Sequence, residues 1–593
     1  MVHRLFDIVA LRSKQAPDEV MLSAKEHGTW RTYSCRDVWQ TSVSLAAGLL
    51  KLGINNQVLE PLAQEKIAII SPNRPEWIMT DIGAQLTGGV LTPIYPTISP
   101  DEITYVLSEA EVKIIFVANA DIYNRFKDAF DALPSLQHVY SFDDIPGVKN
   151  WKDLMLPNAT TDDALLARIT PETLATIIYT SGTTGNPKGV MLTHKNIVSN
   201  VQDSMPAFTF ATKGSKALSF LPLNHIFERM VTYIYLQAGV SIYYAENMDT
   251  IGLNLKEVKP LVFTTVPRLL EKVYERIMTT GMELTGIKKV LFFWALSLGK
   301  RYDNANKGSL WYQLQLAIAN ALVFSKWREA LGGNTKAIVV GSAATQERLV
   351  RIFSAAKIVI MEGYGLTETS PVVSVNRFES EDRRIGTIGP LINNVEVKLA
   401  EDGEILTRGN NVTIGYFKHP ELMEGVFEKD GWFHTGDIGT WVEGRFLKIT
   451  DRKKEIFKTS GGKYVAPQVI ENKVKESPFV EQMMVVGDGK KFVSALVVPS
   501  FVQLRKYLRE NYPNLIVPEN NNDLIKMKEV LAHMQKQIDK FNPLFSHPEQ
   551  VKKIALLANE WTIDSGELTP SLKIKRKIIL QKFAKEIDGI YAD

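Results

Sequence analysis

The stretch ATIIYTSGTTGNPKGV, from Ala175 to Val190, places a buried-strand pattern directly before a loop of small and hydroxyl residues. In such a loop the backbone N–H groups approach an anion closely, the hydroxyls add donors, and Lys188 supplies a full positive charge. The stretch therefore predicts a phosphate-binding loop after a strand. It differs from the common G-x-x-x-x-G-K-[ST] loop, because Gly rather than Ser or Thr follows Lys188. The candidate phosphate-binding residues are Thr180, Ser181, Gly182, Thr183, Thr184, Gly185 and Lys188.

Similar strand patterns on both sides of this loop predict an α/β fold. Short apolar runs alternate with amphipathic helical stretches, and each run ends near a small or polar residue. The runs are KIAIIS (66–71), VLTPIYP (90–96), VKIIFV (112–117), SIYYAE (241–246), VFTTVP (262–267), AIVVGS (337–342) and IVIMEGYG (358–365). This alternation is typical of parallel sheets, whose ligands bind at the carboxyl ends of the strands.

The pattern changes twice in the second half of the chain. From about residue 384 to 449, short alternating segments broken by Gly and Asn predict antiparallel strands. After DRKKE (451–455) a Lys-rich section begins, with strands and helices of its own. We therefore predict an N-terminal domain over 1–450, which includes a small β-barrel-like subdomain at about 384–450. A smaller mobile α+β domain is predicted over 451–593.

Composition excludes several classes of protein. The net charge of +3 on 593 residues is too small for a general nucleic-acid binder, so no nucleic-acid polymer is expected as a partner. The single cysteine, Cys35, excludes an intramolecular disulfide and fits a reducing compartment. Arg4, Asp7 and Arg12 interrupt the first apolar stretch, so we expect neither a signal peptide nor secretion. No stretch reaches the ~20 apolar residues of a membrane span, and a cytoplasmic protein is expected.

Further along the chain, seven motifs follow the phosphate loop. They are LPLNHIFER (221–229), GSAATQ (341–346), YGLTET (364–369), HTGD (434–437), DRKKE (451–455), SGGKY (460–464) and SLKIKRK (571–577). In kind and in order these eight motifs resemble the adenylate-forming superfamily, which comprises acyl-CoA synthetases, adenylation domains of peptide synthetases and beetle luciferases. The resemblance covers nearly the whole chain.

The motif YGLTET also has a chemical logic of its own. Tyr364 offers a flat face to a purine, Thr367 a hydroxyl to a phosphate, and Glu368 a carboxylate to Mg²⁺. The resemblance implies the same three roles. It further implies that Asp437 binds the ribose. It also implies that small residues line the adenine pocket, although without the resemblance such small residues would fit an ordinary strand-to-helix turn. The small residues are Gly341, Ser342, Ala343, Gly363 and Gly365.

The C-terminal motifs imply residues with different roles in the reaction. Arg452 resembles the family arginine on the ribose and phosphate side, Lys454 stands at the hinge position, and Lys573 is the candidate catalytic lysine. A cation delivered to the α-phosphoryl group would stabilise the charge that develops there. The family more often has Gly where this chain has Leu572, and a basic solvated tail is the alternative interpretation. Gly461, Gly462 and Lys463 are the candidates for the coenzyme A side. Lys575 and Lys577 are alternatives to Lys573 as the catalytic lysine. Lys453 and Glu455 are expected to lie on a solvated face.

His225 and the helical stretch 281–330 bear on the substrate. A lone histidine in an apolar segment is most often a core residue, whereas the resemblance implies a position near the acyl carboxylate. The motif LPLNHIFER resembles the LPLxHxFER form of long-chain acyl-CoA synthetases. Residues 281–330 are rich in Leu, Phe, Trp and Ala and carry flanking basic residues, which suits an acyl tunnel, core packing or contact with anionic lipid.

Together these features predict an AMP-forming long-chain fatty acid–CoA ligase. Its substrates would be a long-chain fatty acid, ATP with Mg²⁺, and coenzyme A as cosubstrate. One alternative is a fatty-acyl-AMP ligase that passes the acyl group to a carrier protein, and a second is a nucleotide-binding regulator without activity. The sequence leaves open a homodimer and peripheral contact with the inner face of a membrane.

Overall fold

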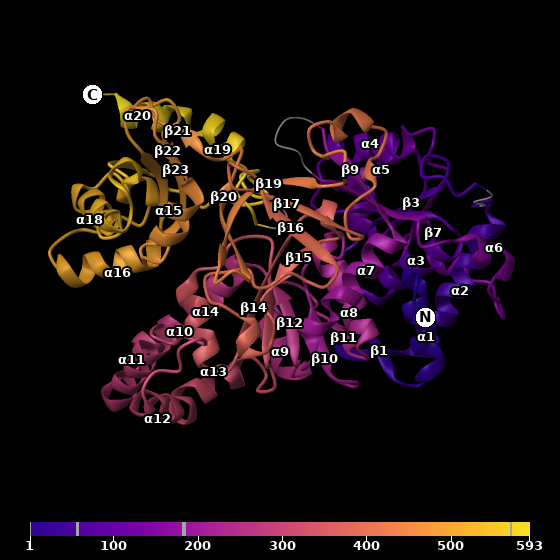
Figure 1. Cartoon of the computed structure of the whole chain (residues 1–593), viewed down its shortest axis with the longest axis horizontal. Helices are drawn as coiled ribbons and strands as arrows, with labels where there is room; N and C mark the ends of the chain where they lie inside the picture. The colour runs from indigo at the N-terminus through magenta and orange to yellow at the C-terminus, as the bar shows by residue number, and fades with distance from the viewer. Residues whose placement is uncertain (1, 55–57, 181–185, 570–571, 593) are drawn as a thin grey trace.

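The computed structural model describes residues 2–54, 58–180, 186–569 and 572–592, and its large part is built on two mixed sheets (Figure 1). Within these described ranges each sheet has eight strands. The first has the order β15 (Val372–Val375), β14 (Val359–Gly365), β13 (Ala337–Val340), β12 (Val262–Thr265), β10 (Lys216–Ser219), β11 (Ser241–Tyr244), β1 (Val20–Glu26) and β2 (Thr29–Ser34). The second has the order β18 (Gly415–Tyr416), β9 (Lys188–Thr193), β8 (Leu174–Thr180), β4 (Val90–Ile94), β3 (Lys66–Ile70), β5 (Val112–Val117), β6 (His138–Ser141) and β7 (Lys149–Asn150).

The predicted parallel pairing is confirmed for the inner strands of both sheets. In the first sheet β11, β10, β12, β13 and β14 run parallel, and in the second β8, β4, β3 and β5 do so. Antiparallel strands add to the edges, where β1 turns back into β2, β14 pairs with β15, and β8 turns back into β9. The sheets are therefore mixed, and the sequence rhythm had predicted their parallel interior.

Two helices lie buried in the core that joins the sheets. Nearly every residue of α3 (Pro75–Leu86) and α8 (Ile226–Gln237) is buried, and both belong to one core cluster with strands of both sheets. The polar groups of these helices pair with each other. The Arg229 guanidinium donates to Asp81 at 2.5 Å and to the Thr176 hydroxyl at 2.8 Å, so the buried charge is compensated.

A four-stranded antiparallel sheet lies between the large sheets and the C-terminal segment (Figure 1). Its order is β16 (Val395–Leu399), β17 (Glu404–Gly409), β19 (Phe433–Val442) and β20 (Phe446–Arg452). The antiparallel strands predicted within residues 384–449 are thereby confirmed. The last strand continues to Arg452, which pairs in register with Asp437 on β19.

The C-terminal segment has its own sheet and its own core. A three-stranded sheet of β23 (Val480–Val486), β24 (Ser494–Pro499) and β25 (Lys553–Leu556) packs against α15 (Pro467–Val474) and α18 (Lys528–Asp539). A two-residue pair, β21 (Phe457–Lys458) and β22 (Tyr464–Val465), precedes it. At the boundary with the large part, Arg268 pairs with Glu481, and Arg348 donates to the Glu476 carbonyl at 2.6 Å.

Helices form a corner of the large part below the C-terminal segment (Figure 1). They are α10 (Pro267–Glu283), α11 (Gly286–Lys300), α12 (Leu310–Ala319), a π-helical turn (Asn320–Phe324) and α13 (Ser325–Ala330). The helical character predicted for 281–330 is confirmed. In the portion of the chain that the structure describes, no helix combines the length and the apolar character needed to span a bilayer.

Candidate active site

The predicted phosphate loop follows β8, the strand that was expected to precede it. Thr180 ends β8 and Lys188 begins β9, so both lie at the same end of the sheet, and both are partly buried. The ammonium of Lys188 lies 5.7 Å from the centre of the Tyr416 ring. Five predicted residues, Ser181, Gly182, Thr183, Thr184 and Gly185, lie outside the described residues.

The small residues predicted for the adenine pocket follow two neighbouring parallel strands. Gly341, Ser342 and Ala343 come directly after β13, while Gly363 and Gly365 lie within the end of the adjacent β14. A Cβ on Gly341 would lie 3.1 Å from the Phe227 ring, which is tighter than an ordinary contact. Small residues at these positions therefore keep side chains out of the space at the carboxyl ends of the strands.

Tyr364, Asp437 and Arg452 form a hydrogen-bonded group across two sheets. The Tyr364 hydroxyl donates to Asp437 Oδ2 at 2.8 Å, and Arg452 Nε lies 3.2 Å from Asp437 Oδ1. Burial raises the pKa of Asp437, and the Arg452 guanidinium opposes this shift. Each carboxylate oxygen keeps a second lone pair, so Asp437 retains the capacity to accept hydrogen bonds from a ribose diol.

Glu368 and Thr367 lie in a short 3-10 turn (Thr367–Thr369) after β14, and both are partly buried. Glu368 Oε1 accepts a hydrogen bond from the Tyr416 hydroxyl at 3.0 Å, and the Glu368 carbonyl accepts one from the Thr413 N–H at 2.7 Å. Tyr416 thus connects Glu368 with Lys188, since its ring also faces that ammonium. The sequence reasoning missed Tyr416, which lies 48 residues from Glu368 on a short edge strand.

Lys573 reaches the same place from the C-terminal segment. Burial and the charge of Arg452 lower the pKa of Lys573 to about 8, against the opposing charges of Asp437, Glu455 and Glu368. Its ammonium therefore interacts electrostatically with charged residues of the turn after β14, of β19, of β20 and of the turn after β20. Its competitors are placed differently, since Lys577 is exposed and the Lys575 N–H donates to the Glu567 carbonyl.

A hydrogen-bonded turn holds Lys573 in place. The Thr569 N–H donates to the Lys573 carbonyl at 2.8 Å, and the Lys573 N–H donates to the Thr569 hydroxyl at 3.0 Å. The Leu572 N–H donates to the Thr569 carbonyl, and Leu572 has a φ of +60°. That left-handed conformation is the reason why glycine suits this position, although this chain carries leucine there.

His225 caps the N-terminus of α8, where its Nδ1 accepts a hydrogen bond from the Phe227 N–H at 3.2 Å. Burial and the charge of Lys573 lower the pKa of His225 to about 3, so the ring is neutral at physiological pH. With Nδ1 as acceptor, the hydrogen of the neutral ring resides on Nε2. His225 therefore has a structural hydrogen bond and also lies close enough to Lys573 to interact with its charge.

The hinge and coenzyme A candidates lie outside this group of residues. Lys454 is exposed in the turn after β20, and Gly461, Gly462 and Lys463 are exposed in the turn between β21 and β22. Gly462 has a φ of +77°, which glycine adopts without strain.

The solvated face expected at Lys453 and Glu455 is wrong for Glu455. That carboxylate is partly buried and accepts a hydrogen bond from Arg576 Nε at 2.7 Å. Lys453 is exposed but pairs with Asp402 at 2.6 Å and Glu404 at 2.8 Å. Both residues therefore fix the backbone on either side of Lys454.

Glu362 is a second residue that the sequence reasoning missed. It lies on β14 two residues before Tyr364, is buried, and its Oε2 has no hydrogen-bond partner among the described residues. Burial, reinforced by the charge of Glu347, raises the pKa of Glu362 to about 8. A buried oxygen without a partner beside Tyr364 is able to accept a hydrogen bond from a ligand. Its place in the MEGYG run was the available signal.

The described residues contain no cluster of three or more His, Cys, Asp or Glu side chains suited to a metal ion. Glu368 is thus a lone carboxylate next to a hydroxyl residue, Thr367. That donor set fits Mg²⁺ better than a transition metal, because Mg²⁺ commonly takes one or two protein carboxylates and fills its shell with water and substrate phosphates.

The chain matches models of one enzyme family over most of its length. A model of the AMP-binding enzyme family matches residues 9–417. The chain belongs to the AMP-binding enzyme family. A model of the AMP-binding enzyme C-terminal domain also matches residues 454–512 and 508–593. The family predicted from the eight motifs is confirmed, and it implies the predicted use of ATP and coenzyme A.

Individual members of the AMP-binding enzyme family are similar over nearly the whole chain. The long-chain-fatty-acid–CoA ligase FadD15 of Mycobacterium bovis is 33% identical and covers 97% of this chain and 95% of its own. Fatty acyl-CoA synthetase A of Dictyostelium discoideum is 31% identical, with coverages of 97% and 88%. Among solved structures, the adenylation domain of the carboxylate reductase from Mycobacterium chelonae has a TM-score of 0.77 at 20% identity, covering 100% of this chain and 91% of that domain. The predicted fold class is confirmed.

Proposed function

We propose that this enzyme is an AMP-forming long-chain fatty acid–CoA ligase. The observation that carries the proposal is the position of Lys573 among Asp437, Arg452 and Glu368, next to the Tyr364 group. This arrangement suits a reaction in which a carboxylate attacks a nucleoside triphosphate. The names of the relatives in Mycobacterium bovis and Dictyostelium discoideum support a fatty acid as the acyl substrate and, for the first, a long-chain one.

In the proposed first step a carboxylate oxygen attacks the α-phosphorus of ATP. The new P–O bond forms as the bond to pyrophosphate breaks, giving acyl-adenylate. Negative charge accumulates on the α-phosphoryl oxygens, and the Lys573 ammonium neutralises it. Lys188, Thr180 and the phosphate loop hold the triphosphate, and Glu368 with Thr367 would hold Mg²⁺, which neutralises phosphate charge when bound.

The nucleoside would bind where Tyr364, Asp437 and Glu362 meet. Tyr364 offers a ring face to adenine beside Gly341, Ser342, Ala343, Gly363 and Gly365, and Asp437 accepts from the ribose together with the neighbouring Arg452. The unpartnered Glu362 oxygen accepts from the exocyclic amine of adenine. The Nε2–H of His225 donates to an oxygen of the acyl carboxylate, a role that a ring neutral at physiological pH retains.

In the proposed second step the sulfur of coenzyme A attacks the carbonyl carbon of the acyl-adenylate. The C–S bond forms, the C–O bond to AMP breaks, and the thiol proton goes to solvent. We propose that residues 451–593 rotate as a mobile domain about Lys454 relative to 1–450. The rotation withdraws Lys573 and brings Gly461, Gly462 and Lys463 to the site.

The test incubates the purified protein with MgATP and fatty acids from short to very long, with and without coenzyme A, and measures pyrophosphate, AMP and acyl-CoA. We expect acyl-CoA with a maximum at long chains. Pyrophosphate without acyl-CoA would replace the proposal with the fatty-acyl-AMP ligase, and no pyrophosphate with any acid would refute both. Omission of Mg²⁺ should abolish pyrophosphate release.

A further inference from the structure

Two helices at the corner of the large part present apolar side chains to solvent. On α11 the exposed stripe consists of Ile287, Val290 and Phe293, and on α12 and the π-helical turn after it the stripe consists of Leu310, Trp311, Leu314, Ile318 and Leu322. Both stripes repeat every three to four residues, which is the spacing of one helix face. The two helices pack together, since the Tyr312 hydroxyl donates to the Leu298 carbonyl at 3.0 Å.

These exposed apolar side chains are grouped along two neighbouring helices and are not scattered. Leu310 is 84% exposed, Ile287 77% and Trp311 67%, and all eight lie within 36 residues of sequence. Isolated exposed apolar residues are normal on any protein, whereas a group of this kind marks an interaction surface. The opposite sides of the same helices pack normally, with Phe292, Leu296 and Phe324 buried in their own core cluster.

The surroundings of the stripes are basic. Residues 281–330 contain seven Lys or Arg against three acidic residues, Glu283, Asp303 and Glu329, of which Glu329 pairs with Lys326, whereas the entire chain carries a net charge of only +3. Lys288 and Lys289 lie at the start of α11, Lys300 ends it, and Lys307 precedes α12, all four exposed. The basic residues therefore border the apolar stripes at both ends of α11.

The geometry points to an anionic lipid bilayer as the partner of this face: we propose that α11 and α12 lie in the bilayer surface, with their apolar stripes among the acyl chains and their lysines at the headgroups. Such helices combine an apolar face with Lys or Arg at its border and with Trp, Phe or Leu on it. At about 1.5 Å per residue α11 is roughly 22 Å long, too short to cross a hydrocarbon core of about 30 Å.

Charge favours this partner over a second copy of the chain. A symmetric pair through this face would bring the two sets of lysines into one interface, where like charges repel. An anionic membrane surface instead attracts each of them. The location at an outer corner of the molecule also suits contact with a flat surface (Figure 1).

The role of the contact rests on the proposed function, because a long-chain fatty acid resides in bilayers and membrane contact would give the enzyme access to it. Vesicle binding requires no substrate, so it is measured separately from activity. The full-length protein is mixed with vesicles of neutral phosphatidylcholine or with vesicles in which about a third of the lipid is phosphatidylglycerol, and the bound fraction is measured by flotation at low and high salt. We expect binding to the anionic vesicles and a loss of at least tenfold on neutral ones.

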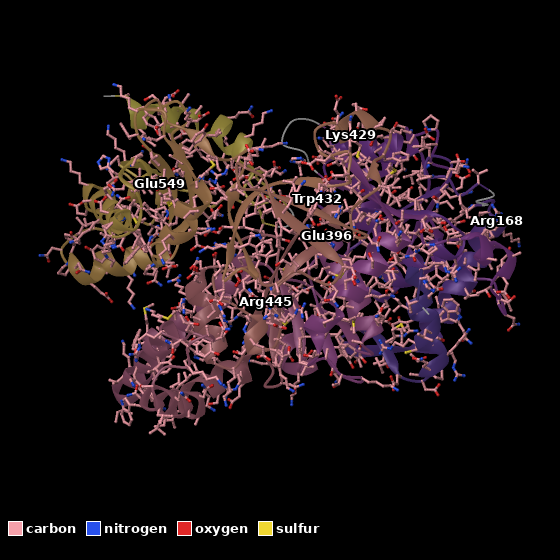
Figure 2. The ribbon with its side chains drawn as sticks, in the orientation of Figure 1. Arg168, Glu396, Lys429, Trp432, Arg445 and Glu549 are labelled. Atoms are coloured by element: carbon pink, nitrogen blue, oxygen red, sulfur yellow. The ribbon has the colours of Figure 1, made fainter. Side chains whose placement is uncertain are left out.

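Two variants separate the contributions. W311S/L314S removes two exposed apolar side chains, and K288E/K300E reverses two exposed charges, so neither alters the core. We expect each variant to weaken binding at least tenfold. The binding that W311S/L314S retains should depend strongly on salt, because its lysines remain, whereas the binding that K288E/K300E retains should not. The matched controls are L253S, an exposed leucine on α9 (Ile251–Val258), and K429E, which Figure 2 shows far from α11 and α12. Both controls should bind like the unchanged protein.

Three results would overturn the proposal. They are no binding of the unchanged protein to anionic vesicles, equal binding of all variants, or a dimer in sedimentation that W311S/L314S converts to a monomer. The proposed function is tested on the same preparations with a water-soluble shorter fatty acid. Acyl-CoA formation without vesicle binding would refute the docking alone, whereas vesicle binding without adenylate formation would refute the function alone.

Discussion

Two turns of the C-terminal segment carry a lysine, and they meet opposite surroundings. Lys573 lies in a hydrogen-bonded turn and interacts with Arg452, Asp437 and Glu368. Lys463 lies in an exposed turn between β21 and β22. The large part thus accommodates one lysine turn while the other faces solvent. This arrangement suits one half of the proposed reaction, and the other half requires the segment to rotate.

The largest expected effect comes from removing the Lys573 ammonium, which interacts with the site residues. Lys573→Ala should lower the rate of pyrophosphate release by about 10²–10³-fold, because a cation at the developing phosphoryl charge is lost. Acyl-CoA formation from supplied acyl-adenylate should stay within a few-fold of the unchanged enzyme. Lys577→Ala, an exposed lysine four residues on, is the matched control. Equal loss of both half-reactions in Lys573→Ala would contradict the separate roles of the two turns.

The next largest effect is expected at Lys454, the hinge candidate. Lys454→Pro restricts φ at an exposed residue between two anchored neighbours, and it should slow thioester formation by about tenfold or more while adenylate formation changes less. Single-turnover measurement of both half-reactions checks this. Lys454→Ala keeps the backbone free and should behave like the unchanged enzyme. If Lys454→Pro slowed both steps equally, rotation about this residue would be excluded.

A smaller effect follows from the lowered pKa of Lys573. Because the pKa of Lys573 in the folded protein is about 8, the charged form predominates below that pH and is lost as the pH rises through it. The kcat/KM for pyrophosphate release should therefore fall above about pH 8, to roughly a tenth one unit higher. Arginine keeps its charge in this pH range. The pH profile of Lys573→Arg should therefore not fall above pH 8, whatever the absolute rate of this variant. A fall that persists in Lys573→Arg would assign the titration to another group.

The sequence predicted what repeats locally, and it missed what depends on distant contacts. The strands before Gly341 and Tyr364 were visible as apolar runs, and the motif order placed Asp437 and Lys573 with the nucleotide residues. Tyr416 gave no such signal, because its hydrogen bond to Glu368 arises only when β18 pairs with β9 beside the β14 turn. Glu362 had a signal in its place in the MEGYG run, but its buried unpartnered oxygen is a property of packing and not of spacing.

The smallest expected effect concerns Leu572, where this chain departs from the usual glycine. The side chain contacts both the core of the large part and the core of the C-terminal segment, while its left-handed backbone costs about 1–2 kcal/mol. Leu572→Gly removes the strain and the contact together, so the free energy of unfolding should change little. The lost contact should slow adenylate formation a few-fold relative to thioester formation.

Leu572→Ala separates these two contributions, because alanine keeps the strain and loses most of the contact. It should therefore be less stable than Leu572→Gly in denaturant unfolding, while its ratio of half-reaction rates shifts in the same direction. If the ratio stayed constant in both variants, the Leu572 side chain would contribute to packing alone. The glycine common at this position would then differ from leucine only in backbone strain. A shifted ratio would instead mean that Leu572 favours the arrangement in which Lys573 lies in the site and Lys463 faces solvent.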